Sequence, residues 1–150
     1  MSFVFDSNVC IAAGQTSPED ALSAGNYPAS GSYINVGGYT HVVCLIHLGA
    51  IHANDDPKFE LKQADSTTGT LDTINATYAA KTLGGDDDDE FVVLEVDLSV
   101  LSADHHFLSC VVSGVTNGSY GDIVFLLFGS KEKPVTQKAT VNNLFYYGQS

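Results

Sequence analysis

Arginine is absent from this chain, and lysine is scarce. The 150 residues contain six lysines and eighteen acidic residues, so the formal net charge at pH 7 is −12. Binding of nucleic acid depends on cationic side chains that neutralise phosphates and release counterions. Bidentate hydrogen bonding to a phosphate or carboxylate also requires the guanidinium group of an arginine. The sequence therefore argues against DNA or RNA as a partner.

Cysteines are few, and a leader peptide and a long apolar run are missing. The three cysteines, Cys10, Cys44 and Cys110, are an odd number at wide spacing, which does not make a disulfide framework. The first residues, MSFVFDSNVC, lack the basic start and apolar stretch of a signal peptide. No window approaches the roughly 20 apolar residues of a membrane span. We therefore expect a protein made in a reducing cytoplasm that contacts no membrane.

The composition that is present favours β-structure. Apolar residues make up 44% of the chain and charged residues only 16%, below the roughly 25% charged residues of an average soluble domain. Polarity comes instead from Ser, Thr, Asn, Gln and Gly, which suits strands joined by many turns better than a helical bundle. A chain of this length is normally one domain with a full core.

Strand-like segments recur along the chain between turns rich in Gly, Asn or Asp. The predicted strands are residues 3–13, 40–49, 58–65, 77–83, 91–99, 107–115 and 123–129. Asn117-Gly118 is the strongest hairpin signal and predicts that strand 123–129 pairs back on strand 107–115. The predicted fold is all-β, a single-domain β-sandwich or jelly roll with an extended N-terminal arm and a C-terminal tail.

Three parts of this single domain are expected. Residues 1–33 are an arm and a long loop, with one helical turn at residues 18–22. Residues 34–130 form the sandwich core, and residues 131–150 form a tail or last strand. Long loops in compact domains tend to be functional or bound to a partner.

Five consecutive acidic residues, Asp86 to Glu90, precede an apolar strand. A calcium loop alternates its acidic residues with spacers so that the oxygen ligands surround one ion. Contiguous aspartates lack that spacing, and in an extended chain neighbouring carboxylates point in opposite directions. We interpret the run as the solvated tip of a hairpin whose like charges oppose aggregation. Weak binding of divalent cations is the alternative.

Cys44 and His47 resemble half of a zinc site. On a strand, however, residues three apart point to opposite faces. Cys44 is then expected beside Val42 and Ile46, and His47 on the same side as His41. The two histidines lie six residues apart, about 20 Å along a strand, which is too far for one ion. The sequence predicts buried free cysteines and no metal site.

No set of catalytic residues can be assembled. The chain contains no G-x-S-x-G turn, no phosphate-binding loop and no H-E-x-x-H motif. Carboxylate pairs such as Asp97 with Asp104, or Asp122 with Glu132, cannot be told from ordinary surface residues. We therefore expect a protein that is not an enzyme and uses no cofactor.

Aromatic residues cluster at both ends of the chain. Tyr and Phe are enriched at interface anchors, although a terminal aromatic cluster also suits a strand that covers a sandwich. Both interpretations stay open for the C-terminal cluster and for the N-terminal one. The residues predicted to contact a partner are Phe3, Phe5, Pro134, Val135, Leu144, Phe145, Tyr146 and Tyr147.

Several short motifs resemble those of small structural proteins of tailed bacteriophages. The matching residues are Gly38 and Tyr39; Lys62, Gln63, Ala64 and Asp65; Val96, Asp97 and Leu98; and Gly129, Pro134 and Val135. Together they span roughly residues 33 to 137. The chain departs from the pattern near Pro134, where Lys131 and Glu132 replace an Arg-Tyr pair.

This resemblance implies a head decoration, or cement, protein. Such proteins bind the outside of the expanded capsid at junctions between capsomers, stiffen the shell and catalyse nothing. The implied partners are the major capsid protein and further copies of the chain, as a dimer or trimer. The implied location is the outer capsid surface of the virion, after synthesis in the host cytoplasm. Removing residues 1–13 is expected to lower capsid occupancy without unfolding the sandwich.

Two other functions are compatible with the same sequence. One is a β-domain of a phage tail, fibre or baseplate, which would share the fold class at a different location. The other is a carbohydrate-binding β-sandwich module, which needs an exposed row of aromatic side chains or a calcium site. Tyr27, Tyr33 and Tyr39 are the residues that could supply such a row.

Overall fold

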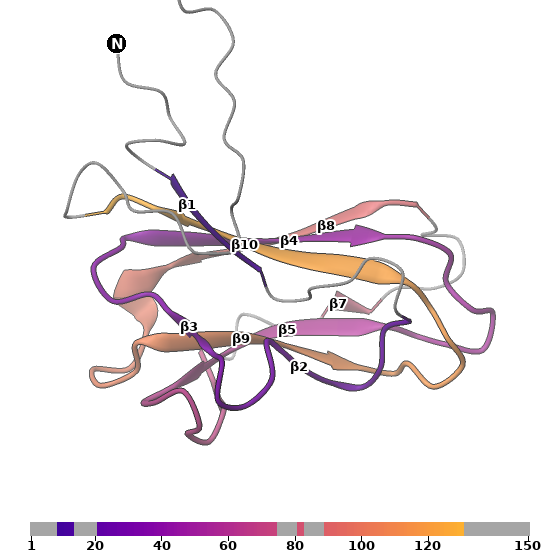
Figure 1. The fold of residues 1–150 in the computed structure, drawn as a ribbon, viewed down its shortest axis with the longest axis horizontal. Coiled ribbons are helices and arrows are strands. Elements are labelled where there is room, and N and C mark those ends of the chain that lie inside the picture. Colours follow the sequence, from indigo (N-terminus) through magenta and orange to yellow (C-terminus); the bar gives the residue numbers. More distant parts are fainter. Residues whose placement is uncertain (1–8, 14–20, 75–80, 83–88, 131–150) are drawn as a thin grey trace, which may run out of the picture.

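Two antiparallel sheets stacked on each other make a β-sandwich (Figure 1). The computed structural model describes residues 9–13, 21–74, 81–82 and 89–130. Within those ranges the only helical element is the 3-10 turn η2 (Leu98–Val100), and no helix there is long and apolar enough to cross a membrane. The all-β sandwich predicted from the sequence is confirmed.

The first sheet has the strand order β1-β10-β4-β8 and forms the upper layer in Figure 1. Its strands are β1 (Val9–Ala13), β10 (Gly121–Phe128), β4 (His41–Leu48) and β8 (Phe91–Asp97). The second sheet has the order β2-β9-β5-β6, with β3 also paired to β9 and β7 to β5. Its strands are β2 (Gly25–Tyr27), β3 (Ile34–Asn35), β5 (Lys58–Ala64), β6 (Asp72–Thr73), β7 (Lys81–Thr82) and β9 (Phe107–Ser113).

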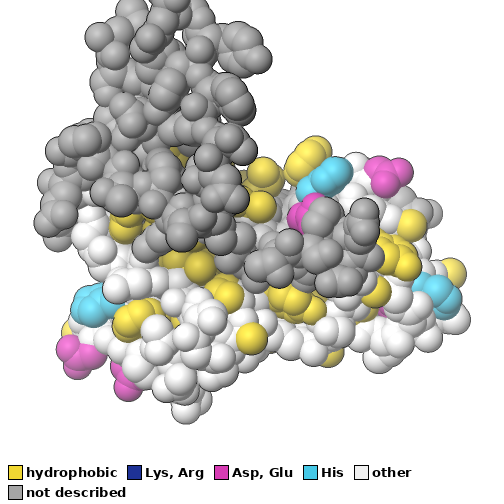
Figure 2. All heavy atoms as spheres, in the orientation of Figure 1, with side chains coloured by type: hydrophobic (Ala, Val, Ile, Leu, Met, Phe, Trp, Pro, Cys, Tyr) yellow, Lys and Arg dark blue, Asp and Glu magenta, His cyan; other side chains and the backbone are white. Residues whose placement is uncertain are grey.

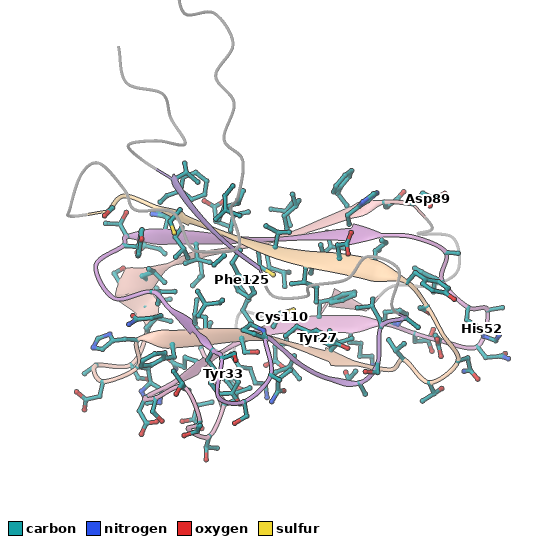
Figure 3. All side chains as sticks on the ribbon, viewed as in Figure 1. Tyr27, Tyr33, His52, Asp89, Cys110 and Phe125 are labelled. Carbon is teal, nitrogen blue, oxygen red and sulfur yellow. The ribbon has the colours of Figure 1, made fainter. Side chains whose placement is uncertain are left out.

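The core lies between the sheets and follows the alternation of the strands. Along β4, the buried residues are Val42, Cys44, Ile46 and Leu48, while His41 and His47 point outward. This confirms the predicted facing of Cys44 and the two histidines. From the second sheet, Phe59, Leu61, Leu108, Cys110 and Val112 fill the same space. Phe125 and Cys110 face this interior from opposite layers (Figure 3).

The predicted hairpin between the last two described strands is wrong. β9 belongs to the second sheet and β10 to the first, so the Asn117-Gly118 loop crosses from one layer to the other. A local turn signal favours a reversal of the chain, but it cannot specify whether the next strand pairs with its neighbour. Here β9 finds partners in β2, β3 and β5, and β10 finds them in β1 and β4.

In its described part, residues 9–13 and 21–33, the predicted arm and loop contains the strands β1 and β2. β1 occupies the second half of the predicted strand 3–13 and pairs with β10 from Val9 opposite Phe128 to Ala13 opposite Val124. β2 pairs with β9, and Ala21 forms an isolated bridge with Tyr120. Short strands of three residues have too little sequence for a visible alternation, which is why β2 was missed.

Several predicted features lie outside the described residues. They are residues 1–8, most of the proposed helical turn, most of the strand predicted at 77–83, the acidic run up to Asp88, and residues 131–150. Of the acidic run, the structure describes Asp89 and Glu90, which are both exposed. Asp89 has a φ of 59° and lies at the rim of the first sheet (Figure 3).

Candidate interaction surface

The three cysteines are predicted from the sequence to be buried and free rather than to bind a metal. All three cysteines are free and buried. Burial raises the pKa of the Cys44 thiol, and the neighbouring Cys110 thiol raises it further. A protonated thiol inside a core is a weak nucleophile and a weak ligand. Among the described residues, no group of three or more His, Cys, Asp or Glu side chains could hold a metal ion.

Asp55 is the most deeply buried carboxylate in the described part of the chain, at 2% exposure. It lies in the loop between β4 and β5, where its own N–H donates to the His52 carbonyl at 2.8 Å. His52 marks this end of the sandwich in Figure 3. Its oxygens accept hydrogen bonds from the Thr116 N–H at 2.9 Å, from the Asn117 side-chain amide at 2.8 Å and from the Ser119 hydroxyl at 2.8 Å. Asp55 thus joins the two loops that cross between the sheets at this end.

Two opposing effects set the pKa of Asp55. Desolvation is the largest single effect and raises it, but hydrogen bonds from Thr116, Asn117 and Ser119 together outweigh it. The pKa of this carboxyl therefore lies well below its ordinary value of 3.8. A carboxylate surrounded by donors has its lone pairs occupied, so it cannot also coordinate a cation. Asp55 therefore holds the loop that contains Asn117-Gly118 in place through these hydrogen bonds.

Asp55→Asn is expected to destabilise the protein at neutral pH and to remove part of the acid dependence of its stability. A carboxyl whose pKa is lowered by folding stabilises the fold above its ordinary value of 3.8. That contribution disappears as the pH falls through this value toward the lower pKa of the folded state. Urea unfolding from pH 7 to pH 2.5 measures the effect. Asp56→Asn, at the exposed neighbouring position, is the control, and identical pH profiles for both variants would contradict the assignment.

The three tyrosines considered for a sugar platform do not form an exposed row. Tyr33 is only 6% exposed and accepts a hydrogen bond from Asn26. The Tyr27 hydroxyl donates to the Ser23 carbonyl at 2.9 Å. Tyr39 packs against the core, where burial and the nearby Cys10 raise its pKa to about 12. This arrangement removes the main sequence argument for a carbohydrate-binding module.

The outward side of the first sheet carries a continuous apolar surface. We call it the apolar face. Its members, from β4, β8 and β10, are Val43, Leu45, Phe91, Val93, Val124, Leu126 and Phe128. The register places Val124 beside Leu45 and Leu45 beside Val93, so one apolar row crosses three strands. Phe91 and Val93 are 61% and 58% exposed.

On the outward side of the second sheet, β5 presents charged side chains to solvent. Lys58, Glu60 and Lys62 point outward from β5, and Lys62 forms an ion pair with Glu60 at 3.7 Å. β9 adds the exposed Ser113 and the half-buried Phe107 and Val111 to the same side. Ser109 also lies on this side but is fully buried, and its hydroxyl donates to the Pro28 carbonyl at 2.8 Å. An antiparallel sheet in a sandwich normally has one such wet face. The apolar face differs from this side because one apolar row crosses three neighbouring strands, and contiguous apolar surface of this kind marks interaction sites.

Acidic and histidine side chains border the apolar face. Glu95 and Asp97 continue the outward row of β8, and Asp122 begins that of β10. His47 stacks on Phe91, with ring centroids 4.5 Å apart and an interplanar angle of 12°. No strand of this sheet contains a lysine. In the view of Figure 2, hydrophobic, acidic and histidine side chains meet along the upper surface, and no described lysine is visible.

The chain enters and leaves the described sandwich beside this face. Val9, the first residue of β1, pairs with Phe128, the last residue of β10. The eight residues predicted to contact a partner all lie in residues 1–8 and 131–150, outside the described residues. The apolar face itself was not predicted as a site. Its signal is visible in the sequence, because strand 123–129 is apolar at both alternating sets of positions.

In comparisons with protein-family models and with curated proteins, nothing matches this chain.

Proposed function

We propose that the protein is a non-enzymatic structural protein that binds the outer surface of a phage capsid and bridges neighbouring capsomers. The short motifs from residue 33 to residue 137 that resemble phage structural proteins support the viral setting. The apolar face supports a role in binding a large surface. Its partners are the major capsid protein and further copies of the chain, and its location is the outside of the virion.

The observation that carries this proposal is the position of the apolar face relative to the chain ends. An apolar row crosses three strands, and residues 9 and 128 pair at one end of the same sheet. The chain therefore enters the described sandwich at Val9 and leaves β10 at Phe128 beside each other, at one edge of the sheet that carries the face. Several modest contacts made together gain about 10²–10⁴-fold in avidity, which suits a protein that joins capsomers.

Charge supports an external location. The chain carries −12 and no arginine, so it would be repelled by packaged DNA. A closed dimer or trimer would multiply the number of contacts with the shell.

Val93→Ser is expected to lower binding to purified empty phage heads by about tenfold, because a valine buried in a contact contributes of order 1–2 kcal/mol. Co-sedimentation of the protein with heads measures the occupancy. Val100→Ser is the matched control, since Val100 is also exposed, at 39%, but lies on η2 outside the apolar face. The control is expected to bind like the unaltered protein.

Failure of the unaltered protein to sediment with heads would overturn the capsid assignment. Sedimentation with purified tails instead would select the tail, fibre or baseplate alternative. A deletion that tests the N-terminal arm must remove no residue beyond residue 8. Removing residues 1–13 would also delete β1, whose Cys10 and Ala12 are part of the core.

A further inference from the structure

The apolar face is the outermost layer of the described sandwich. The described strands form two layers, so none of them makes a third layer above β4, β8 and β10. Phe91 and Val93 are more than half exposed, and the other five members of the face are half-buried. A monomer in water would be expected to cover such a surface.

We propose that residues 131–150 of the same chain cover the apolar face when the protein is free in solution. The inference is independent of the capsid assignment, because it concerns the isolated protein.

The first argument is the position and length of the segment. It follows β10, whose outward residues Val124, Leu126 and Phe128 lie in the face. The eight residues of β10 span about 26 Å at about 3.3 Å per residue. Leu144 is fourteen residues beyond Ser130, and fourteen extended residues reach about 46 Å. The cluster Leu144 to Tyr147 can therefore reach every part of the face.

The second argument is charge. Residues 131–150 contain three of the six lysines and one of the eighteen acidic residues, a net charge of +2. The rest of the chain carries −14. The face is bordered by Glu95, Asp97 and Asp122, and its strands contain no lysine. A basic segment with aromatic residues thus complements an apolar surface with an acidic rim.

A second copy of the sandwich is a poorer occupant. A face-to-face pair would bring the rims of Glu95, Asp97 and Asp122 from two copies together. Like charges brought together in a contact oppose association. A tethered segment, by contrast, acts at an effective concentration in the millimolar range.

The test is a cross-link in the full chain carrying Val93→Cys and Tyr146→Cys. Dissolved oxygen with a copper catalyst oxidises two neighbouring thiols to a disulfide, and the oxygen takes up the electrons and protons. The native cysteines are buried, so the two new thiols should react. We expect a disulfide within one chain, seen at monomer mass on a non-reducing gel and by peptide mass spectrometry.

The matched control is Ser113→Cys with Tyr146→Cys, because Ser113 is exposed on the outward side of the second sheet. It should form at most a tenth as much cross-link. Products at dimer mass would assign the face to a second copy and overturn the proposal. Equal yields from the two pairs, or none from either, would also overturn it.

A second measurement does not depend on one pair of positions. The chain ended at Ser130 should bind a dye for apolar surfaces several-fold more strongly than the full chain, and Phe145→Ser with Tyr146→Ser should give an intermediate increase. The double substitution keeps the full chain length, so it reports on the face if the shortened chain does not fold. Unchanged dye binding in the double variant would contradict the inference.

Discussion

Replacing Phe125 with alanine is expected to lower the free energy of unfolding by about 3–5 kcal/mol. The Phe125 ring is fully buried. Its neighbours across the strands are Cys44 on β4 and Ala12 on β1. Both are small and buried, so the ring has room between them and extends toward the second sheet. An alanine would leave a cavity that these small neighbours cannot fill.

The loss is a large part of the roughly 5–15 kcal/mol by which domains of this kind are stable. Urea unfolding followed by circular dichroism measures it. Phe91→Ala is the matched control, because Phe91 is 61% exposed and its main described contact is the stacked ring of His47. That change should cost about 1 kcal/mol or less. Similar losses at both positions would mean that Phe125 is not at the centre of the core.

Gly114→Ala is expected to destabilise the fold by roughly 2–5 kcal/mol. Gly114 follows the last residue of β9 and begins the crossing loop, with a φ of +73°. A methyl group there would collide with the backbone carbonyl of Asp56. The two segments cannot simply separate, because the Asp56 N–H donates to the Gly114 carbonyl at 2.9 Å and Asp55 holds the same loop.

Gly118→Ala separates the effect of φ from the effect of the collision. Gly118 has a φ of +95° in the same loop, but a methyl group there meets nothing within 4 Å. Its cost should be about 1 kcal/mol, from the unfavourable φ alone. Thermal unfolding of both variants side by side measures the difference. Equal losses would show that the approach of Asp56 to Gly114 does not constrain the loop.

Much of the fold could be predicted because it depends on alternation within single strands. Cys44 was expected with Val42 and Ile46, apart from His41 and His47, and the structure places them so. Phe59 and Leu61 likewise alternate with Lys58, Glu60 and Lys62 along β5, and both are buried. The side-chain period of two along a strand is a local property, so a single segment of sequence is enough to establish it.

The Asn117 loop shows where local reasoning fails. Asn117-Gly118 has the composition of a tight hairpin, yet the loop crosses between the layers. Asn117 is used instead to hold Asp55, a residue sixty-two positions earlier. Such a pairing cannot be read from the spacing of either segment. Nothing in the run from His52 to Pro57 distinguishes Asp55 from Asp56 before the fold brings one of them against the loop.

The candidate surface was missed for a related reason. Val93 and Leu45 belong to strands that are far apart in the sequence, and each looks like an ordinary outward residue when its strand is considered alone. Only the register, with Val124 beside Leu45 and Leu45 beside Val93, joins them into one apolar row. The eight contact residues predicted from the chain ends lie outside the described residues and stay a prediction.

The sequence by itself determined the β class, the alternation of side chains along single strands, and a net charge of −12 with no arginine. These follow from the period of single strands and from composition, which need no knowledge of the partner strands. Tertiary structure alone decided which strands became neighbours. It therefore decided that Asp55 binds the loop between β9 and β10 through hydrogen bonds. It also decided that apolar residues from three strands meet on one outward face. Pairing of strands distant in sequence is set by the packing of the whole core, and no local pattern contains it.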